Sequence, residues 1–143
     1  MEQGKKIIIT VSTTVKSNTE RVWQYWTEPE HIVKWNYASE DWHTPSAVND
    51  LRKGGKFLSR MEAKDGSTGF DLEGVYDEVV EHELIEFTMG DERKVKIVFI
   101  NKGDNTEIVE SFETEDINSA EMQRNGWQAI LDNFKKYAES VIS

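Results

Sequence analysis

Cysteine is absent from this chain of 143 residues, and proline occurs only twice. Without cysteine the chain has no disulfide, zinc–thiolate site or thiol chemistry, and we expect an intracellular, cytoplasmic setting. Long apolar runs are also missing, and the short β-branched stretch after Met1–Lys6 is too interrupted for a signal segment or a membrane span. We therefore expect no integral membrane association.

Basic residues are scarce beside acidic ones. The chain has 17 Lys and Arg against 27 Asp and Glu, for a formal net charge of −10. Such a surface repels phosphate backbones, so nucleic acid is not an expected partner, and the charge serves solubility.

Hydrophobic residues, by contrast, make up 37% of the chain, and five of them are Trp. This composition is that of a globular protein with an aromatic-rich core. No linker or internal repeat interrupts it, so we expect a single domain over residues 1–143, as a monomer or a homodimer.

The order of local patterns predicts an α+β fold. Residues 6–16 alternate between two faces and are rich in β-branched side chains, which predicts a strand. Capping patterns at residues 17–20 and 27–30 predict two short helices that end near Trp26 and Trp35. From Tyr37 onward the patterns indicate six antiparallel strands joined by tight turns, five of them at residues 57–64, 69–77, 84–89, 94–100 and 106–114.

A long helix is predicted from Asn118 to about Val141. Its apolar arc covers roughly half of the circumference, which is wider than a minimal amphipathic stripe. Such a helix must be covered by a concave surface, and the meander of strands supplies one. Apolar residues and glycine on this arc are Met122, Gly126, Trp127, Ala129, Ile130, Leu131, Phe134, Tyr137, Ala138 and Val141.

Several short motifs resemble one family across nearly the whole chain. They comprise residues 42–45 (WHTP), 50–57 (DLRKGGKF), 60–66 (RMEAKDG), 74–76 (GVY), and 126–131 (GWQAIL) with Phe134. Together with the element order they resemble the helix-grip (START-related, SRPBCC) superfamily, in the branch similar to the C-terminal domain of the activator of the heat-shock chaperone ATPase. The resemblance implies a long C-terminal helix packed across a curved sheet, in a fold that hosts lipid carriers, cyclases and interaction modules.

Inward-facing apolar side chains are the first candidates for ligand contacts. They can fill a solid core or line a cavity, and the number of rigid aromatic rings favours a cavity. Trp42, in the expected loop after the second short helix, is either a lid over that cavity or folded onto the core. The candidates are Trp26, Trp35, Trp42, Phe57, Met61, Phe70, Phe87, Phe99, Phe112, Trp127, Ile130 and Phe134.

Polar or small residues within apolar faces are the second group of candidates. Gln123, Gly126 and Asn133 lie on the apolar arc of the last helix. Glu110 alternates in phase with Ile108 and Phe112, so it points inward unless a bulge shifts the phase. A buried carboxylate without a partner has a raised pKa and often marks a functional site.

Signatures of catalysis and of cofactor binding are missing. The three histidines are scattered, so no metal site is predicted. Gly54-Gly55 precedes a strand rather than a helix, which argues against a phosphate loop, and no nucleophile elbow or spaced carboxylate pair is present. We expect no cofactor and no catalytic residues.

Three functions remain open at this point. The first is a binding protein for a small hydrophobic, lipid-like or aromatic ligand between sheet and helix. The second, implied by the resemblance, is an interaction protein that regulates a heat-shock chaperone ATPase. The third is an enzyme of the cyclase or hydrolase kind, for which Glu110 is the one reasonable acid–base residue.

Overall fold

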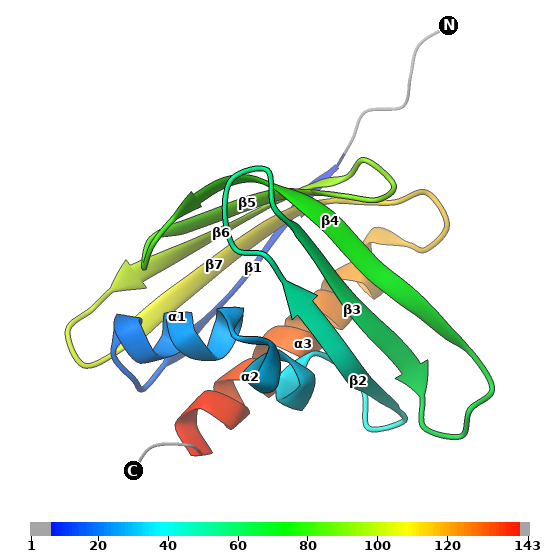
Figure 1. The fold of residues 1–143 in the computed structure, drawn as a ribbon, viewed down its shortest axis with the longest axis horizontal. Helices are drawn as coiled ribbons and strands as arrows, with labels where there is room; N and C mark the ends of the chain where they lie inside the picture. The colour runs from blue at the N-terminus through cyan, green and yellow to red at the C-terminus, as the bar shows by residue number, and fades with distance from the viewer. Residues whose placement is uncertain (1–6, 141–143) are drawn as a thin grey trace, which may run out of the picture.

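The computed structural model describes residues 7–140, and Val141 of the predicted final helix lies outside that range. Three helices lie on one side of a curled sheet (Figure 1). The elements in chain order are β1 (Ile8–Val15), α1 (Thr19–Thr27), α2 (Pro29–Trp35), β2 (Trp42–Asn49), β3 (Lys56–Ala63), β4 (Gly69–Val80), β5 (Leu84–Met89), β6 (Lys94–Asn101), β7 (Thr106–Glu113) and α3 (Ala120–Ser140).

The sheet has seven strands in the order β1-β7-β6-β5-β4-β3-β2, and every neighbouring pair is antiparallel. Strands β2 to β7 form a meander, whereas β1, the first strand of the chain, pairs with β7, the last. Register shifts between His43 and Ser46 in β2 and between Tyr76 and Glu78 in β4 interrupt the ladders. Such bulges bend a strand and increase its twist, which helps the sheet to curl.

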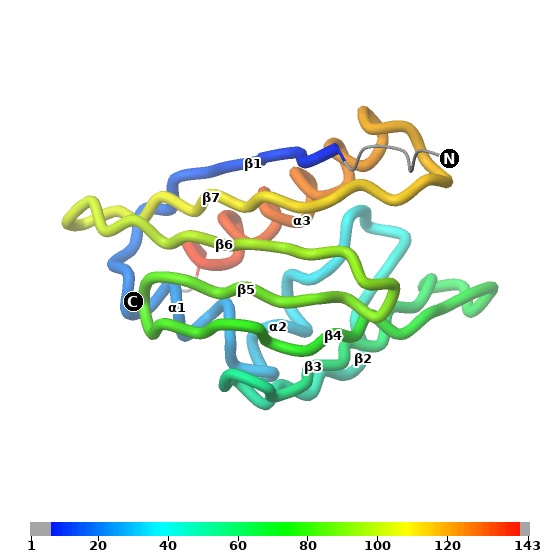
Figure 2. Tube along the Cα trace, turned by 90° about the horizontal axis from the view of Figure 1, so that it is seen from above, coloured from blue at the N-terminus to red at the C-terminus, as the bar shows by residue number. Residues whose placement is uncertain are grey.

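The helices divide the concave side between them. Helix α3 runs under β1 and β7, while α1 and α2 lie under the middle strands and β2 (Figure 2). Leu131, Phe134 and Ala138 of α3 are fully buried against this face. The core they join contains the inward residues of β1, which are Ile9, Val11 and Val15.

Most predicted elements are confirmed, and the helix-grip α+β fold is the observed one. Some local predictions were wrong, among them the cap of α2, where Glu28 and not Thr27 is the N-cap residue. The helix α1 is capped by the side chain of Asn18, which accepts from the Arg21 N–H, and not by Ser17, whose side chain is buried. Trp42 and His43 begin strand β2 rather than lying in a loop, because both pair with β3.

Helix α3 also covers the outer edge of β1. Arg124, Gln128 and Lys135 donate hydrogen bonds to the backbone carbonyls of Thr10, Ser12 and Thr14 at 3.1, 3.3 and 2.6 Å. None of these three residues belongs to the predicted apolar arc of the helix. Arg124 is exposed and the other two are half-buried, and all three occupy acceptors that an edge strand would otherwise offer to another chain.

Candidate functional site

A cavity of about 290 Å³ lies between the concave face of the sheet and the three helices. Its volume is at the lower end of the roughly 300–1,000 Å³ that ligand pockets occupy. Both short helices, strands β2 to β7 and α3 contribute to the wall. The lining residues are Trp26, Ile32, Trp35, Asn36, Val48, Asn49, Phe57, Ser59, Met61, Phe70, Leu72, Tyr76, Ile85, Phe87, Met89, Arg93, Ile97, Glu110, Trp127 and Ile130.

Contacts between aromatic rings hold much of the wall in place. Trp26 and Trp35 lie with their ring centroids 4.7 Å apart, and Phe57 contacts Phe87 edge-to-face at 4.8 Å. Trp127 stacks on Phe112 at 4.0 Å with an interplanar angle of 8°, so Phe112 supports the cavity wall from behind. Each ring pair of this kind stabilises the folded protein by roughly 0.5–1.5 kcal/mol beyond the contribution from burial of apolar surface. These contacts favour a preformed cavity over a collapsed one.

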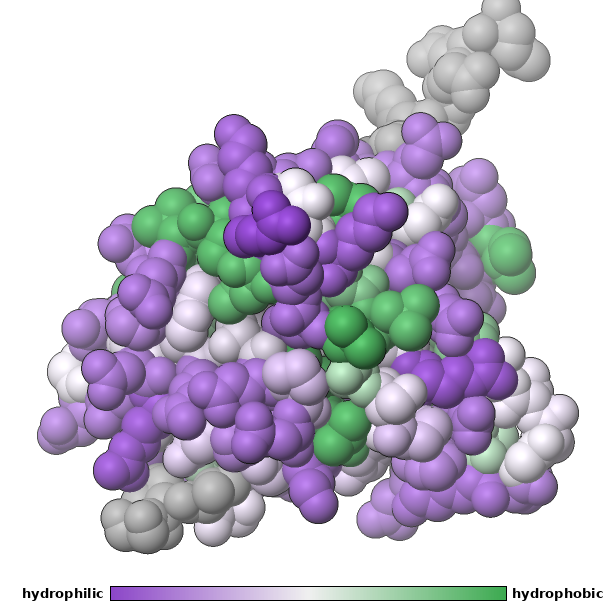
Figure 3. Space-filling view, viewed as in Figure 1, coloured by the Kyte–Doolittle hydropathy of each residue, from purple (hydrophilic) through white to green (hydrophobic). Residues whose placement is uncertain are grey.

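The cavity reaches the surface beside β2 and β4. Val48 is 63% exposed and Phe70 is 50% exposed, although both belong to the lining. The ring of Trp42 lies 5.8 Å from that of Phe70, so it flanks this opening without lining the cavity. On the face seen in Figure 1, hydrophobic residues form small areas among hydrophilic ones rather than one broad patch (Figure 3).

Glu110 is the most unusual group in the wall. Strand β7 pairs continuously with β1 and β6, with no bulge, so Glu110 keeps the inward phase of Ile108 and Phe112. It is only 6% exposed, and no group in residues 7–140 forms a hydrogen bond or ion pair with its carboxyl group. Burial raises the pKa of Glu110 to about 8, so the carboxyl is mostly protonated at pH 7.

Two further buried polar side chains in the wall also lack a partner within the described part of the chain. They are the amide of Asn36, 8% exposed at the end of α2, and the hydroxyl of Ser59, 5% exposed on β3. Every polar side-chain atom that is completely occluded in residues 7–140 does have a hydrogen-bond partner. The unpaired atoms of Asn36, Ser59 and Glu110 therefore retain accessible surface, and the space next to them is the cavity.

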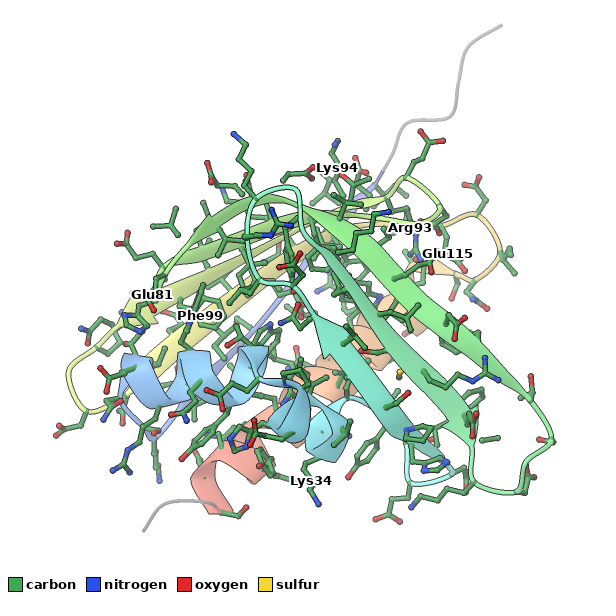
Figure 4. The ribbon with its side chains drawn as sticks, in the orientation of Figure 1. Lys34, Glu81, Arg93, Lys94, Phe99 and Glu115 are labelled. Carbon is green, nitrogen blue, oxygen red and sulfur yellow. The ribbon has the colours of Figure 1, made fainter. Side chains whose placement is uncertain are left out.

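The other polar residues of the wall bond to protein groups. Tyr76 donates to Asn49, which in turn donates to the carbonyl of Thr27 at 2.6 Å. Arg93 forms an ion pair with Asp91 at 2.8 Å. Figure 4 shows Arg93 beside Glu115, whose pKa is lowered first by the backbone hydrogen bond from Asn118 and also by the charge of Arg93. The one cation of the described wall is thus already neutralised.

Comparison with known proteins identifies the family. The model of the activator of Hsp90 ATPase homolog 1-like proteins matches residues 16–139. The chain belongs to this family. No protein with a curated description is similar enough to count as a match.

Solved structures of relatives agree with this assignment. The solution structure of an AHSA1-like protein from Aeromonas hydrophila is 40% identical, with a TM-score of 0.89 over 94% of this chain and 93% of that one. Chr148 from Cytophaga hutchinsonii is 57% identical, with a TM-score of 0.80 over 92% of each chain. Protein CV1439 from Chromobacterium violaceum, at 20% identity and a TM-score of 0.83 over 93% and 98%, shows the same fold.

Nine of the residues predicted to contact a ligand lie in the cavity wall. They come from α1, α2, four strands and α3, which only the folded chain brings together. These residues are Trp26, Trp35, Phe57, Met61, Phe70, Phe87, Glu110, Trp127 and Ile130. Their contact with a ligand stays a prediction.

The two predicted polar contacts on α3 lie elsewhere. Gln123 accepts from the Glu115 N–H and donates to the carbonyls of Glu115 and Asn118, so it holds the turn before α3. Asn133 donates to the carbonyl of Tyr37 and holds the segment between α2 and β2. Both side chains face inward as predicted, but they contact the backbone of loop segments and not the cavity. Buried carbonyls in such irregular segments require hydrogen-bond donors, and these two amides provide them.

Five other predicted contacts also lie outside the wall. Phe99, Phe112 and Phe134 are buried in the core behind it, where neighbouring rings enclose them. Trp42 flanks the opening from β2. Gly126 does not line the cavity, and a Cβ placed on it would meet nothing within 4 Å, so no neighbouring group requires glycine at this position. Met122, on the predicted apolar arc, is exposed.

Sequence patterns missed the polar residues Asn36, Ser59 and Arg93 and eight other wall residues, which are Ile32, Val48, Asn49, Leu72, Tyr76, Ile85, Met89 and Ile97. The alternation of Ser59 with Phe57 and Met61 would have placed it inside. Asn36 and Arg93 lie in irregular segments without periodicity.

Residues 7–140 contain neither a cluster of metal-ligating side chains nor a helix suited to span a membrane. No group of three or more His, Asp and Glu side chains in residues 7–140 could hold a metal ion. Within the same residues, no helix has the length and apolar character needed to cross a membrane.

Proposed function

We propose that this protein binds a small hydrophobic ligand in the cavity between the sheet and α3. The observation that carries the proposal is the combination of aromatic walls, an opening at Val48 and Phe70, and buried polar groups that no residue in 7–140 satisfies. A core evolved only for stability gains nothing from polar atoms without partners, since each costs roughly 1–3 kcal/mol on burial.

Burial of apolar surface would supply the affinity. Removal of about 200 Å² of ligand surface from water contributes ~5 kcal/mol, at ~25 cal/mol per Å². Losses of translational and rotational freedom reduce this figure, so micromolar to millimolar affinity is expected for a ligand of this size.

Filling the cavity tests the proposal. Leu72 of β4 lines the cavity, whereas Leu58 of the neighbouring β3 does not, and both are half-buried. We expect Leu72→Trp to abolish the rise in melting temperature that a library of apolar and aromatic compounds produces in the parent protein, because mass action stabilises only a protein that binds. Leu58→Trp is the matched control and should retain the rise. Absence of any rise with the parent protein across the library would refute the proposal.

Family membership favours one second candidate, an interaction that regulates a heat-shock chaperone ATPase, because the family description names an activator. The acidic surface, with a formal net charge of −10, suits a basic partner. Purified Hsp90-type chaperone should then bind the protein and change its rate of ATP hydrolysis. An unchanged rate at saturating concentration would remove this candidate.

Ligand binding without chemical conversion is the form that we propose. Glu110 is the wall's one carboxyl group among the described residues, and no histidine lines the cavity with it. An acid–base enzyme would need a second proton carrier at the reacting atom. The cysteine-free composition favours action in the cytoplasm.

A further inference from the structure

The three unpartnered polar groups of the cavity come from three separate elements. Glu110 is on β7, Ser59 is on β3 four strands away in the sheet, and Asn36 ends α2. Each is more than nine-tenths buried and each lines the same cavity. Hydrogen-bonding capacity is therefore presented from opposite walls of an otherwise apolar space, which selects for polar atoms on the ligand.

The charges around the cavity argue against an anionic ligand. Arg93 already pairs with Asp91 and lies close to Glu115. Glu110 has no cation near it in the described structure, since desolvation alone accounts for the rise of its pKa. A ligand carboxylate would have to enter a protein of formal net charge −10 and find no free cation in this wall.

A neutral carboxyl group and a carboxylate offer different hydrogen bonds. A carboxylate only accepts, whereas a protonated carboxyl group also donates one hydrogen bond. Burial favours the protonated form of Glu110 at neutral pH. Ser59 and Asn36 can each donate and accept, so Glu110 is the group that decides which ligand atom is preferred.

We propose that the cavity selects an uncharged molecule of one or two rings, whose carbonyl or hydroxyl oxygen accepts a hydrogen bond from the carboxyl group of Glu110. This inference rests on the proposed function and narrows it. The size follows from the volume: 290 Å³ holds on the order of ten non-hydrogen atoms at the ~30 Å³ that one water occupies in the liquid. The rings would contact the aromatic side chains, and Ser59 or Asn36 would hold a second polar atom.

Four naphthalenes of nearly equal size separate the alternatives. They are 2-acetylnaphthalene with a neutral acceptor, 2-ethylnaphthalene as its apolar counterpart, 2-naphthoate as the anion and 2-naphthylmethylammonium as the cation. At pH 6.5 the acetyl compound should bind about three- to tenfold more tightly than the ethyl compound, the gain of one buried hydrogen bond. The anion should bind most weakly. Calorimetric titration measures all four affinities.

The pH dependence identifies Glu110 as the donor. As the pH rises from 6.5 to 9.5 the carboxyl ionises and can no longer donate, so binding of the acetyl compound should weaken by about tenfold. Arg93 and Tyr76 are the other titratable groups of the described wall. Neither changes charge in this range, because guanidinium stays protonated and burial raises the pKa of Tyr76. His31 of α2 does not line the cavity and bonds to Tyr137.

Glu110→Gln provides the matched variant, because a carboxamide keeps a donor and does not titrate. It should bind the acetyl compound at pH 6.5 within threefold of the parent and lose the pH dependence. Equal affinity for the acetyl and ethyl compounds would overturn this inference and leave the proposed function intact. If the cation binds most tightly and this preference is lost in Glu110→Gln, the inference is overturned and the cavity is a site for an amine. If none of the four compounds and nothing in the wider library binds, the proposed function itself falls.

Discussion

Glu110 shows how one buried residue links stability to the content of a cavity. A carboxyl group whose pKa is raised in the folded protein binds its proton more tightly when folded than when unfolded. Its contribution to stability is therefore complete below pH 4.5, declines as the pH rises toward 8 and is lost above that value. A residue with this behaviour is costly to keep for packing alone.

We accordingly predict that Glu110→Gln is more stable than the parent protein at alkaline pH. The difference between about 8 and 4.5, at about 1.36 kcal/mol for each pH unit, sets an upper limit of about 5 kcal/mol on the gain in unfolding free energy between pH 4.5 and 9. Urea unfolding at both pH values measures it.

Glu107→Gln is the control for this comparison. Glu107 lies on the same strand, one position out of phase with the inward residues, and pairs with Lys102 at 3.6 Å near the surface. Its removal should change stability by less than about 1 kcal/mol at either pH. The prediction would be contradicted if the difference in unfolding free energy between Glu110→Gln and the parent protein did not grow with pH.

Secondary-structure elements in this fold protect one another, and the edge of β1 is the clearest case. Arg124, Gln128 and Lys135 are spaced by four and seven residues, so they share one stripe of α3. The carbonyls that accept from them belong to alternate residues of β1 and share one edge of the strand. One stripe of the helix thus contacts one edge of the strand.

Replacing all three side chains with Ala should expose this edge. We predict a loss of about 1–3 kcal/mol in unfolding free energy from three surface hydrogen bonds, together with self-association at high protein concentration. Urea unfolding and light scattering after size-exclusion chromatography measure the two effects.

Lys136→Ala, one residue from Lys135 and exposed, is the control for removal of a positive side chain from this helix. It should leave both stability and the monomer-to-oligomer ratio unchanged. Self-association of the control to the same degree as the triple variant would show that the loss of positive side chains, and not the opened edge, is responsible.

Charge is the property of the whole molecule with the most direct physical consequence. A formal net charge of −10 on 143 residues destabilises the compact state through mutual repulsion of the acidic groups. Long-range repulsion is screened once the Debye length falls to about 10 Å at 0.1 M salt.

The melting temperature at pH 7.5 should therefore rise by a few degrees between about 10 mM and 200 mM sodium chloride. A shift of this size corresponds to about 1 kcal/mol for a domain of this length. Differential scanning calorimetry at several salt concentrations measures it. A fall in melting temperature on adding salt would show that specific ion pairs, such as that of Arg93 with Asp91, outweigh the overall repulsion.

Periodicity and turn chemistry in the sequence determined most of the architecture. The alternation in residues 8–15, the Asp65-Gly66 turn with Gly66 at φ +79°, and the broad apolar arc of α3 are local features, and each is observed. Local steric preferences and the need to bury apolar faces act on neighbours along the chain, so a sequence shows them directly.

Only the tertiary structure decided which inward residues enclose a cavity. Phe134 and Trp127 share the apolar arc of α3, but Phe134 is enclosed by rings of the core while Trp127 faces open space. The Asn133 side chain bonds to the Tyr37 carbonyl, whereas the side chains of Asn36, Ser59 and Glu110 have no partner in the described residues. Periodicity determines the side of an element on which a residue lies, but what it meets there depends on how distant segments fill the space, and here they leave about 290 Å³ unfilled.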